Sequence, residues 1–109
     1  AHVVHDIDEA IEKYYNLLDI GPWSVYTFEP PALRECMFRG KPSDATWRLA
    51  IAWVGDTQFE LIQNLSGETV YTHFLKKKGE GIHHIAFDVD DIEGEIERLK
   101  KCLVVSLFL

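Results

Sequence analysis

Asp6-Ile7-Asp8-Glu9-Ala10-Ile11-Glu12-Lys13 is followed 85 positions later by a related stretch, Asp91-Ile92-Glu93-Gly94-Glu95-Ile96-Glu97-Arg98. The two stretches have identical or chemically similar residues at six of eight positions. An internal repeat of this kind indicates that one supersecondary unit occurs twice. The alternative is an ordinary α+β domain whose two helices share common surface residues. The order of the elements between the copies favours the repeat.

Each copy of the repeat predicts a helix. In the first copy, Asp6 and Glu9 have the spacing of an N-cap residue and its capping-box partner. The apolar residues that follow at helical spacing are Ile7, Ala10, Ile11, Tyr14, Leu17 and Leu18. Gly21-Pro22 predicts that this helix ends near Ile20. In the second copy Asp91 is the predicted N-cap, and the apolar stripe is narrower: Ile92, Ile96 and Leu99.

Between the copies the pattern changes to that of strands. Alternation and turn residues predict strands at 23–28, 34–39, 47–54 and 57–63, with a break at Pro30-Pro31 and a loop at 40–44. Gly55-Asp56 is a strong signal for a two-residue turn, so the last two strands are predicted to form a hairpin. A further strand is predicted at 84–89, before the second helix.

These elements predict an α+β fold of paired βαβββ modules, the second of them incomplete. Residues 1–109 are interpreted as a single domain, with the first module over 1–78 and a partial second module over 79–109. A chain of 109 residues with 47% hydrophobic residues has the size and composition of one packed domain.

Charge narrows the classes of partner. The net charge of −7 argues against a nucleic-acid partner, because binding to a phosphate backbone depends on clustered Lys and Arg. The only basic run, Lys76-Lys77-Lys78, is predicted to be a solvated polar turn.

Neither a signal peptide nor an apolar stretch of about 18 or more residues is visible, so we expect no membrane partner and a cytoplasmic location. Cys36 and Cys102 lack the CxxC spacing and are expected to be reduced thiols without a chemical role.

Two of the predicted strands carry candidate metal ligands. Because alternate side chains of a strand share a face, the large apolar residues of strand 84–89 are predicted to pack beneath the helices, which leaves His84 on the opposite face. Those apolar residues are Ile85, Phe87 and Val89. In strand 57–63 the same reasoning places Phe59 and Leu61 in the core and Glu60 on the other face with Gln58 and Ile62.

A glutamate in the middle of a strand is costly to bury unless it is paired or binds a cation. Each residue also has a plainer interpretation, because a strand glutamate is usually just exposed and adjacent histidines are usually ordinary polar residues. Taken together, an imidazole and a carboxylate suit Zn, Ni, Co, Mn or Fe rather than a thiolate-bound metal. Two ligands alone are too few for a complete site.

One segment resembles the start of the second module in glyoxalase-like proteins of the vicinal oxygen chelate superfamily, notably methylmalonyl-CoA epimerases. The segment is Gly79-Glu80-Gly81-Ile82-His83-His84-Ile85-Ala86-Phe87-Asp88-Val89-Asp90-Asp91-Ile92. Three other segments are similar to the first strand and helix, to the exit of that helix and to the ligand-bearing strand of the same family. They are Ala1-His2-Val3-Val4-His5-Asp6-Ile7-Asp8-Glu9-Ala10, Asn16-Leu17-Leu18-Asp19-Ile20-Gly21-Pro22-Trp23 and Phe59-Glu60-Leu61-Ile62-Gln63. The resemblance extends to Lys101.

The resemblance implies a divalent metal held by residues of both modules. Glu60 matches the ligand of the last strand in the first module, and the paired histidines match the first-strand ligand of the second. The repeat offset and the face of the strand select His84, with His83 as its neighbour and as the alternative. The other two ligands of such a site fall outside residues 1–109. His2 and His5 are left out, because His2 faces the helix and His5 lies at the end of a strand.

The resemblance also implies a class of reaction, in which the metal stabilises negative charge on substrate oxygens. We expect isomerase or lyase chemistry, with proton transfer next to a carbonyl of an acyl-CoA or a small oxygenated acid. No catalytic residue is assigned. The alternatives are an extradiol-type dioxygenase and a non-enzymatic, bleomycin-resistance-like binding protein. Exposed strand edges and apolar surface between modules predict a homodimer.

Overall fold

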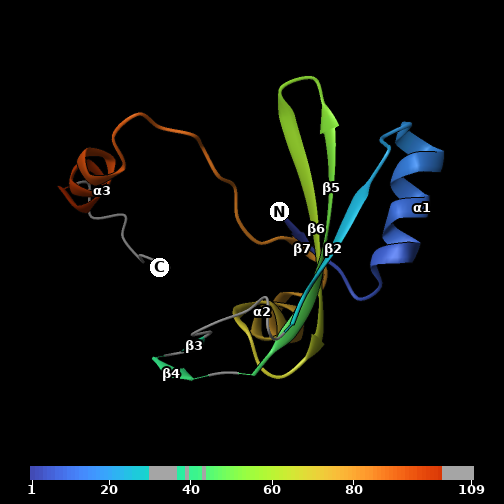
Figure 1. Ribbon diagram of the computed structural model, residues 1–109, viewed down its shortest axis with the longest axis horizontal. Helices are drawn as coiled ribbons and strands as arrows, with labels where there is room; N and C mark the ends of the chain where they lie inside the picture. Colours follow the sequence, from blue (N-terminus) through green and yellow to red (C-terminus); the bar gives the residue numbers. More distant parts are fainter. Residues whose placement is uncertain (30–36, 39, 43, 102–109) are drawn as a thin grey trace.

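The computed structural model describes residues 1–29, 37–38, 40–42 and 44–101, and Figure 1 shows their arrangement. The fold is a mixed α+β architecture, as predicted. In chain order its elements are β1 (His2–Val3), α1 (Ile7–Leu18), β2 (Ser24–Phe28), β3 (Met37–Phe38), β4 (Lys41–Pro42), β5 (Thr46–Val54), β6 (Thr57–Ser66), α2 (Val70–Lys78), β7 (Gly81–Ile82) and α3 (Ile92–Lys101).

The main sheet has five strands in the order β2-β5-β6-β1-β7. β1 runs parallel to β6, whereas the other neighbouring strands are antiparallel. The predicted hairpin is confirmed: β5 and β6 are joined at Gly55-Asp56, and Gly55 has the positive φ of 59° that such a turn requires. The strand predicted at 23–28 is also confirmed as β2.

Two strands of two residues, β3 and β4, pair with each other apart from the main sheet. β3 falls within the strand predicted at 34–39, of which residues 34–36 and 39 lie outside the described part of the chain. β4 falls within the segment predicted to be a loop, so that prediction is wrong at Lys41 and Pro42.

The predicted first helix is confirmed as α1, with Asp6 as its N-cap. The Asp6 carboxylate accepts hydrogen bonds from the backbone N–H groups of Asp8 and Glu9, at 3.0 and 3.2 Å. The helix ends at Leu18, where Asp19 adopts the left-handed conformation with φ 55°. Its first turn is also fixed to the sheet, because Gln63 of β6 accepts a hydrogen bond from the backbone N–H of Ile7 at 2.9 Å.

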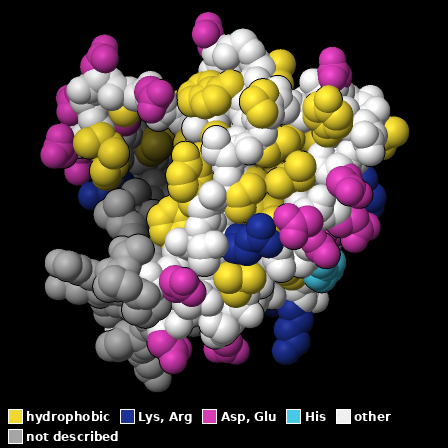
Figure 2. All heavy atoms as spheres, turned by 45° about the vertical axis from the view of Figure 1, so that its right-hand side comes forward, with side chains coloured by type: hydrophobic (Ala, Val, Ile, Leu, Met, Phe, Trp, Pro, Cys, Tyr) yellow, Lys and Arg dark blue, Asp and Glu magenta, His cyan; other side chains and the backbone are white. Residues whose placement is uncertain are grey.

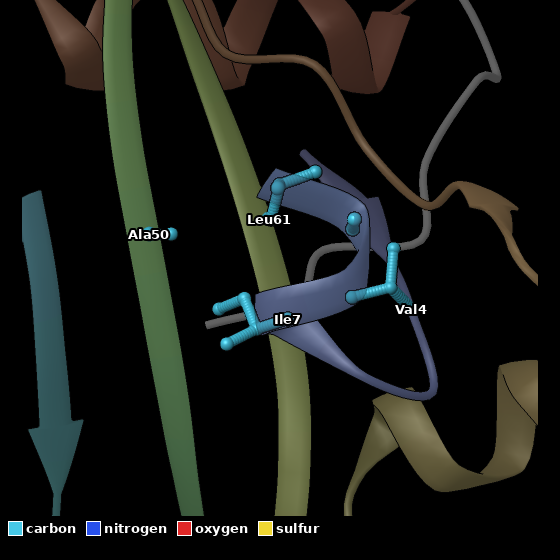
Figure 3. Packing of buried hydrophobic residues seen from close by; sticks show 5 residues of the cluster. Val4, Ile7, Ala50 and Leu61 are labelled. Atoms are coloured by element: carbon cyan, nitrogen blue, oxygen red, sulfur yellow. The ribbon is translucent and has the colours of Figure 1, made fainter. Parts of the chain in front are cut away.

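The core lies between α1 and one face of the hairpin. Figure 3 shows Val4 and Ile7 pointing toward Ala50 of β5 and Leu61 of β6. Ile7 and Leu61 are completely buried. The small side chain of Ala50 leaves the space that lets the helix approach the sheet closely. This face of the sheet is therefore the covered one, as the sequence predicted for Leu61.

A helix that the sequence analysis did not predict, α2, covers part of the opposite face. The basic run Lys76-Lys77-Lys78, predicted to be a turn, forms its last turn, where cations favour the helix dipole. The Thr69 side chain caps the helix and forms a reciprocal capping box with Thr72. The prediction of a turn is wrong because Thr69 starts a helix here. Its capping-box partner is Thr72 instead of the usual Glu or Gln, so the usual sequence signal of a helix start is absent.

The strand predicted at 84–89 is not formed. β7 pairs only with β1 and has two residues, and residues 83–89 continue without regular structure to α3. Figure 1 shows this extended segment leading away from the sheet to α3. The predicted packing of the apolar residues is therefore wrong, since Ile85 is 71% exposed and Phe87 79%. A strand needs a neighbouring backbone to pair with, and the pairing of β7 with β1 covers only Gly81 and Ile82.

The second helix itself is confirmed. Asp91 caps α3, because its carboxylate accepts a hydrogen bond from the backbone N–H of Gly94 at 3.1 Å. Within the described ranges, no helix is both long and apolar enough to cross a membrane.

The α1 core predicts a large loss of stability when Leu61 is truncated. Leu61→Ala removes a completely buried side chain and should lower the free energy of unfolding by about 2–5 kcal/mol. Leu65→Ala near the end of the same strand is the matched control, since Leu65 is 43% exposed and should change stability by less than about 0.5 kcal/mol. Urea unfolding followed by circular dichroism measures both. Equal midpoints for the two variants would contradict the placement of the core.

Candidate metal centre

Glu60 lies in the middle of β6, on the face of the sheet that α1 does not cover. Its pairing partner across the hairpin is Ile51, whereas the next residue, Leu61, pairs with Ala50 in the core. The predicted division of β6 into two faces is therefore confirmed at this position. Glu60 is half-buried, in keeping with a carboxylate at the wall of a cavity.

The rest of this face is divided between α2 and open space. Ile62, on the same face as Glu60, is completely buried, and so is Val3 of the neighbouring strand. Both strands contact α2. Toward the turn of the hairpin the same face is open, and Trp53 is 60% exposed there. Glu60 thus lies at the boundary between the covered and the open part of the sheet.

Glu60 and His84, the two candidate ligands, line the same cavity. It has a volume of about 480 Å³ and lies between the open end of the hairpin and the segment that follows β7. Its wall is formed by Ala1, Trp53, Asp56, Thr57, Gln58, Glu60, His84, Ile85, Ala86, Phe87 and Asp88. Residues 24 positions apart in the chain are therefore brought together around one space.

His84 was predicted to lie on this side of the sheet because of strand alternation, but strand alternation does not explain its position in the structure. Ile85 and Phe87 line the same cavity as His84, although a strand would direct them to the opposite face. Residues 83–89 do not form a strand, so successive side chains of this irregular segment line the cavity. The shared cavity of His84 and Glu60 is thus observed, but the predicted reason for it is wrong.

His83 has a different environment from His84. Its ring lies edge-on to two rings of α2, with centroid distances of 5.3 Å to Tyr71 and 5.1 Å to Phe74. The Nδ1 atoms of His83 and His84 are 3.0 Å apart, within hydrogen-bond distance. Burial lowers the pKa of His83 below its ordinary value, and neighbouring His84 adds to the shift. His83 therefore favours the neutral imidazole.

Tyr71 contacts the His83 ring and lies within electrostatic reach of Glu60. Burial raises the pKa of the Tyr71 phenol above its ordinary value, and the nearby charge of Glu60 raises it further. Tyr71 is therefore a neutral hydroxyl at neutral pH, near enough to Glu60 for its charge to act on the phenol and in edge-on contact with the His83 ring.

The aromatic residues of α2 were not predicted from the sequence to belong to this region. Their signal was present, because Tyr71, Phe74 and Leu75 have helical spacing after the Thr69 cap. Trp53, near the end of β5, was also not predicted to belong to this region, although it lines the cavity.

The donors of the cavity fit a divalent metal in kind but not in number. A carboxylate and an imidazole suit Zn, Co, Ni, Mn or Fe. A catalytic zinc site takes three protein ligands. Among the residues that the structure describes, no group of three or more His, Cys, Asp or Glu side chains could hold a metal ion. Glu60 and His84 are thus donors of a suitable kind, but fewer than a complete site requires.

His2 is confirmed as a residue of the helix-facing side. Its Nδ1 lies 2.7 Å from the hydroxyl of Tyr14 on α1. Burial lowers its pKa below the ordinary value. His2 thus holds β1 to α1 and does not line the cavity of Glu60 and His84.

Two curated proteins are similar to parts of the chain. Mitochondrial methylmalonyl-CoA epimerase of Mus musculus is 38% identical over 55 residues, which are 50% of this chain and 31% of that protein. An uncharacterized protein of Bacillus subtilis (strain 168) is 35% identical over 51 residues, 47% of this chain and 36% of that protein. The matched regions thus span about a third of each relative.

Two solved structures have a similar fold over most of the chain. A hypothetical protein from Bacillus halodurans C-125 matches with a TM-score of 0.65 at 27% identity, over 93% of this chain and 63% of that one. Methylmalonyl-CoA epimerase from Mycobacterium tuberculosis matches with a TM-score of 0.61 at 26% identity, over 93% of this chain and 59% of that one. The chain therefore spans about three fifths of these structures.

The family model described as the glyoxalase/bleomycin resistance protein/dioxygenase superfamily matches residues 1–105. This match covers nearly the whole chain and agrees with the fold of the solved structures. The chain belongs to the glyoxalase/bleomycin resistance protein/dioxygenase superfamily.

Proposed function

We propose that this chain is part of a metal-dependent isomerase or lyase that moves a proton next to a carbonyl group, as a methylmalonyl-CoA epimerase does. The observation that carries the proposal is the cavity shared by Glu60 and His84, the two residues predicted to be ligands. Further support comes from the similarity to two methylmalonyl-CoA epimerases. The proposed substrate is an acyl-CoA or a small oxygenated acid.

In this proposal Glu60 and His84 hold one divalent ion, with further ligands from outside the described residues. When bound, such an ion acts as a Lewis acid toward a substrate oxygen. Glu60 is well suited to this role, because the rigid β5–β6 hairpin fixes its backbone. His84 would provide an imidazole nitrogen from the segment after β7, which lines the same cavity.

The apolar part of the cavity wall has a separate role in the proposal. Trp53, Ile85 and Phe87 line the cavity together with Glu60 and His84, and all three are well exposed. A bound substrate would cover them and displace water from the reacting groups, which strengthens electrostatic interactions with the developing charge. No residue is proposed as the base that removes the proton.

The proposed ligands predict a metal affinity that depends on both side chains. Glu60→Gln and His84→Ala should each weaken Co²⁺ binding by more than about tenfold, because loss of an outer-shell partner alone already costs about that much. Visible absorption of Co²⁺ measures the affinity. Glu68→Gln and His73→Ala are matched controls, since both residues are exposed and outside the cavity. Unchanged affinity in both ligand variants would eliminate the proposed site.

The proposed reaction predicts exchange of the α-proton of methylmalonyl-CoA with solvent. Purified protein loaded with Co²⁺ or Zn²⁺ and incubated in D₂O should incorporate deuterium at the α-carbon, as detected by mass spectrometry, and EDTA should abolish the exchange. A protein that binds metal but gives no exchange would refute the epimerase-like reaction. Iron-dependent uptake of O₂ would assign it instead to the dioxygenases of the superfamily.

We also propose that the protein forms a homodimer, because large hydrophobic side chains are exposed over several elements. Figure 2, with the α1 side turned forward, shows hydrophobic side chains over much of this face. The large hydrophobic residues exposed on α1 and β2 are Tyr15, Leu17, Leu18, Val25 and Tyr26.

Size-exclusion chromatography with light scattering tests the dimer. The expected mass is twice the 12.5 kDa of one chain, at micromolar concentration. A mass of one chain at every concentration tested would contradict the proposed homodimer.

A further inference from the structure

His83 and His84 share a ring-to-ring hydrogen bond, and the ring nitrogen that carries the proton in each residue affects metal binding. The Nδ1 atoms of His83 and His84 are 3.0 Å apart, and a hydrogen bond between two neutral imidazoles needs one donor and one acceptor. One of the two rings must therefore carry its proton on Nδ1, and the other must have Nδ1 free. This bond thus couples the tautomers of the two residues.

The surroundings of the pair assign a different part to each ring. His84 is exposed and lines the cavity with Glu60, whereas His83 is half-buried and packs against the rings of Tyr71 and Phe74. Ala1 holds the backbone of both residues, because the His83 N–H donates to its carbonyl oxygen at 2.9 Å and its amino group donates to the His84 carbonyl oxygen at 2.7 Å. Ring packing therefore makes His83 the held side chain of the pair, and His84 is the accessible one.

We propose that His83 is a positioning residue: its Nδ1 accepts the Nδ1–H of His84 and so leaves Nε2 of His84 unprotonated and available to a metal ion. This inference rests on the proposed metal site. A metal-binding histidine commonly donates its other ring N–H to a partner that fixes the ring and the tautomer. In this chain the partner is the neighbouring imidazole, which α2 holds by aromatic contacts.

The arrangement has a consequence for how α2 contributes to the site. Tyr71 and Phe74 meet the His83 ring edge-on, while its Nδ1 lies within hydrogen-bond distance of His84. A phenylalanine at position 83 would keep these ring contacts but lose the acceptor. An asparagine would keep a polar group near the position of Nδ1 but lose the ring. The two substitutions therefore separate positioning from packing.

The tautomer can be measured without metal. In ¹⁵N-histidine-labelled protein at pH 8, above the ordinary histidine pKa of about 6.5, long-range ¹H–¹⁵N spectra report which ring nitrogen carries the proton. We expect His84 to be protonated on Nδ1 in the wild type and in His83→Asn, and to shift toward the Nε2-protonated form in His83→Phe. Protonation of wild-type His84 on Nε2 would overturn the proposal.

Metal affinity provides the second readout. His83→Phe should weaken Co²⁺ binding by about 10–100-fold, the usual effect of losing an outer-shell partner, and His83→Asn should restore most of it. Unchanged affinity in His83→Phe would overturn the positioning role. So would a loss in both His83 variants with none in His84→Ala, which would make His83 the ligand.

These outcomes are distinct from failure of the proposed function. If the wild type does not bind Co²⁺, or Glu60→Gln and His84→Ala both bind it normally, the metal site fails. The tautomer of His84 in metal-free protein still tests the hydrogen bond with His83 in that case. Circular dichroism and thermal unfolding of each variant ensure that only folded proteins are compared.

Discussion

The antiparallel pairing of β5 with β6 is the interaction on which the rest of the structure depends. It fixes the register in which Leu61 lies opposite Ala50 and Glu60 lies opposite Ile51. Because successive side chains of a strand point to opposite faces, one residue belongs to the α1 core and the next to the candidate site. A slip of one residue would exchange them and place a carboxylate beneath α1. The stability of the core and the position of Glu60 are therefore set by the same register.

The helix α2 adds the second constraint, since it divides the other face of the sheet. It buries Ile62 and leaves the region around Glu60 and Trp53 open. Its aromatic side chains hold His83, through which the segment after β7 is fixed near the sheet. The Thr69 cap that starts α2 is itself held from β6, because its hydroxyl donates to the side chain of Asn64 at 2.9 Å. The hairpin thus forms one part of the cavity wall and, through α2 and His83, helps to position the segment that forms the other part.

The parts of the fold that could be predicted from the sequence are those set by local signals. The Asp6 cap and the apolar spacing after it specify α1, and Gly55-Asp56 specifies the hairpin. α2 was missed because its cap pairs Thr69 with Thr72 and its apolar stripe is short. The strand expected at 84–89 could not be judged from alternation alone, because a strand also needs a partner for its backbone.

The same distinction applies to the candidate site. The assignment of Glu60 to the open face followed from strand alternation and is confirmed. The position of His84 beside the same cavity was expected for a reason that the structure does not support, since residues 83–89 are irregular. The contact of His83 with α2 depends on tertiary packing and had no signal in the local sequence. That Glu60 and His84 bind one metal ion stays a prediction, as does the division of the chain into modules at residue 78.

The most direct test of this prediction is a crystal structure of the protein grown with Zn²⁺ and recorded at the zinc absorption edge. We predict one anomalous peak about 2.0–2.2 Å from both a carboxylate oxygen of Glu60 and Nε2 of His84, the usual bond lengths to zinc. A peak bonded to neither residue, or to His83 in place of His84, would contradict the assignment of these two residues as ligands of one ion.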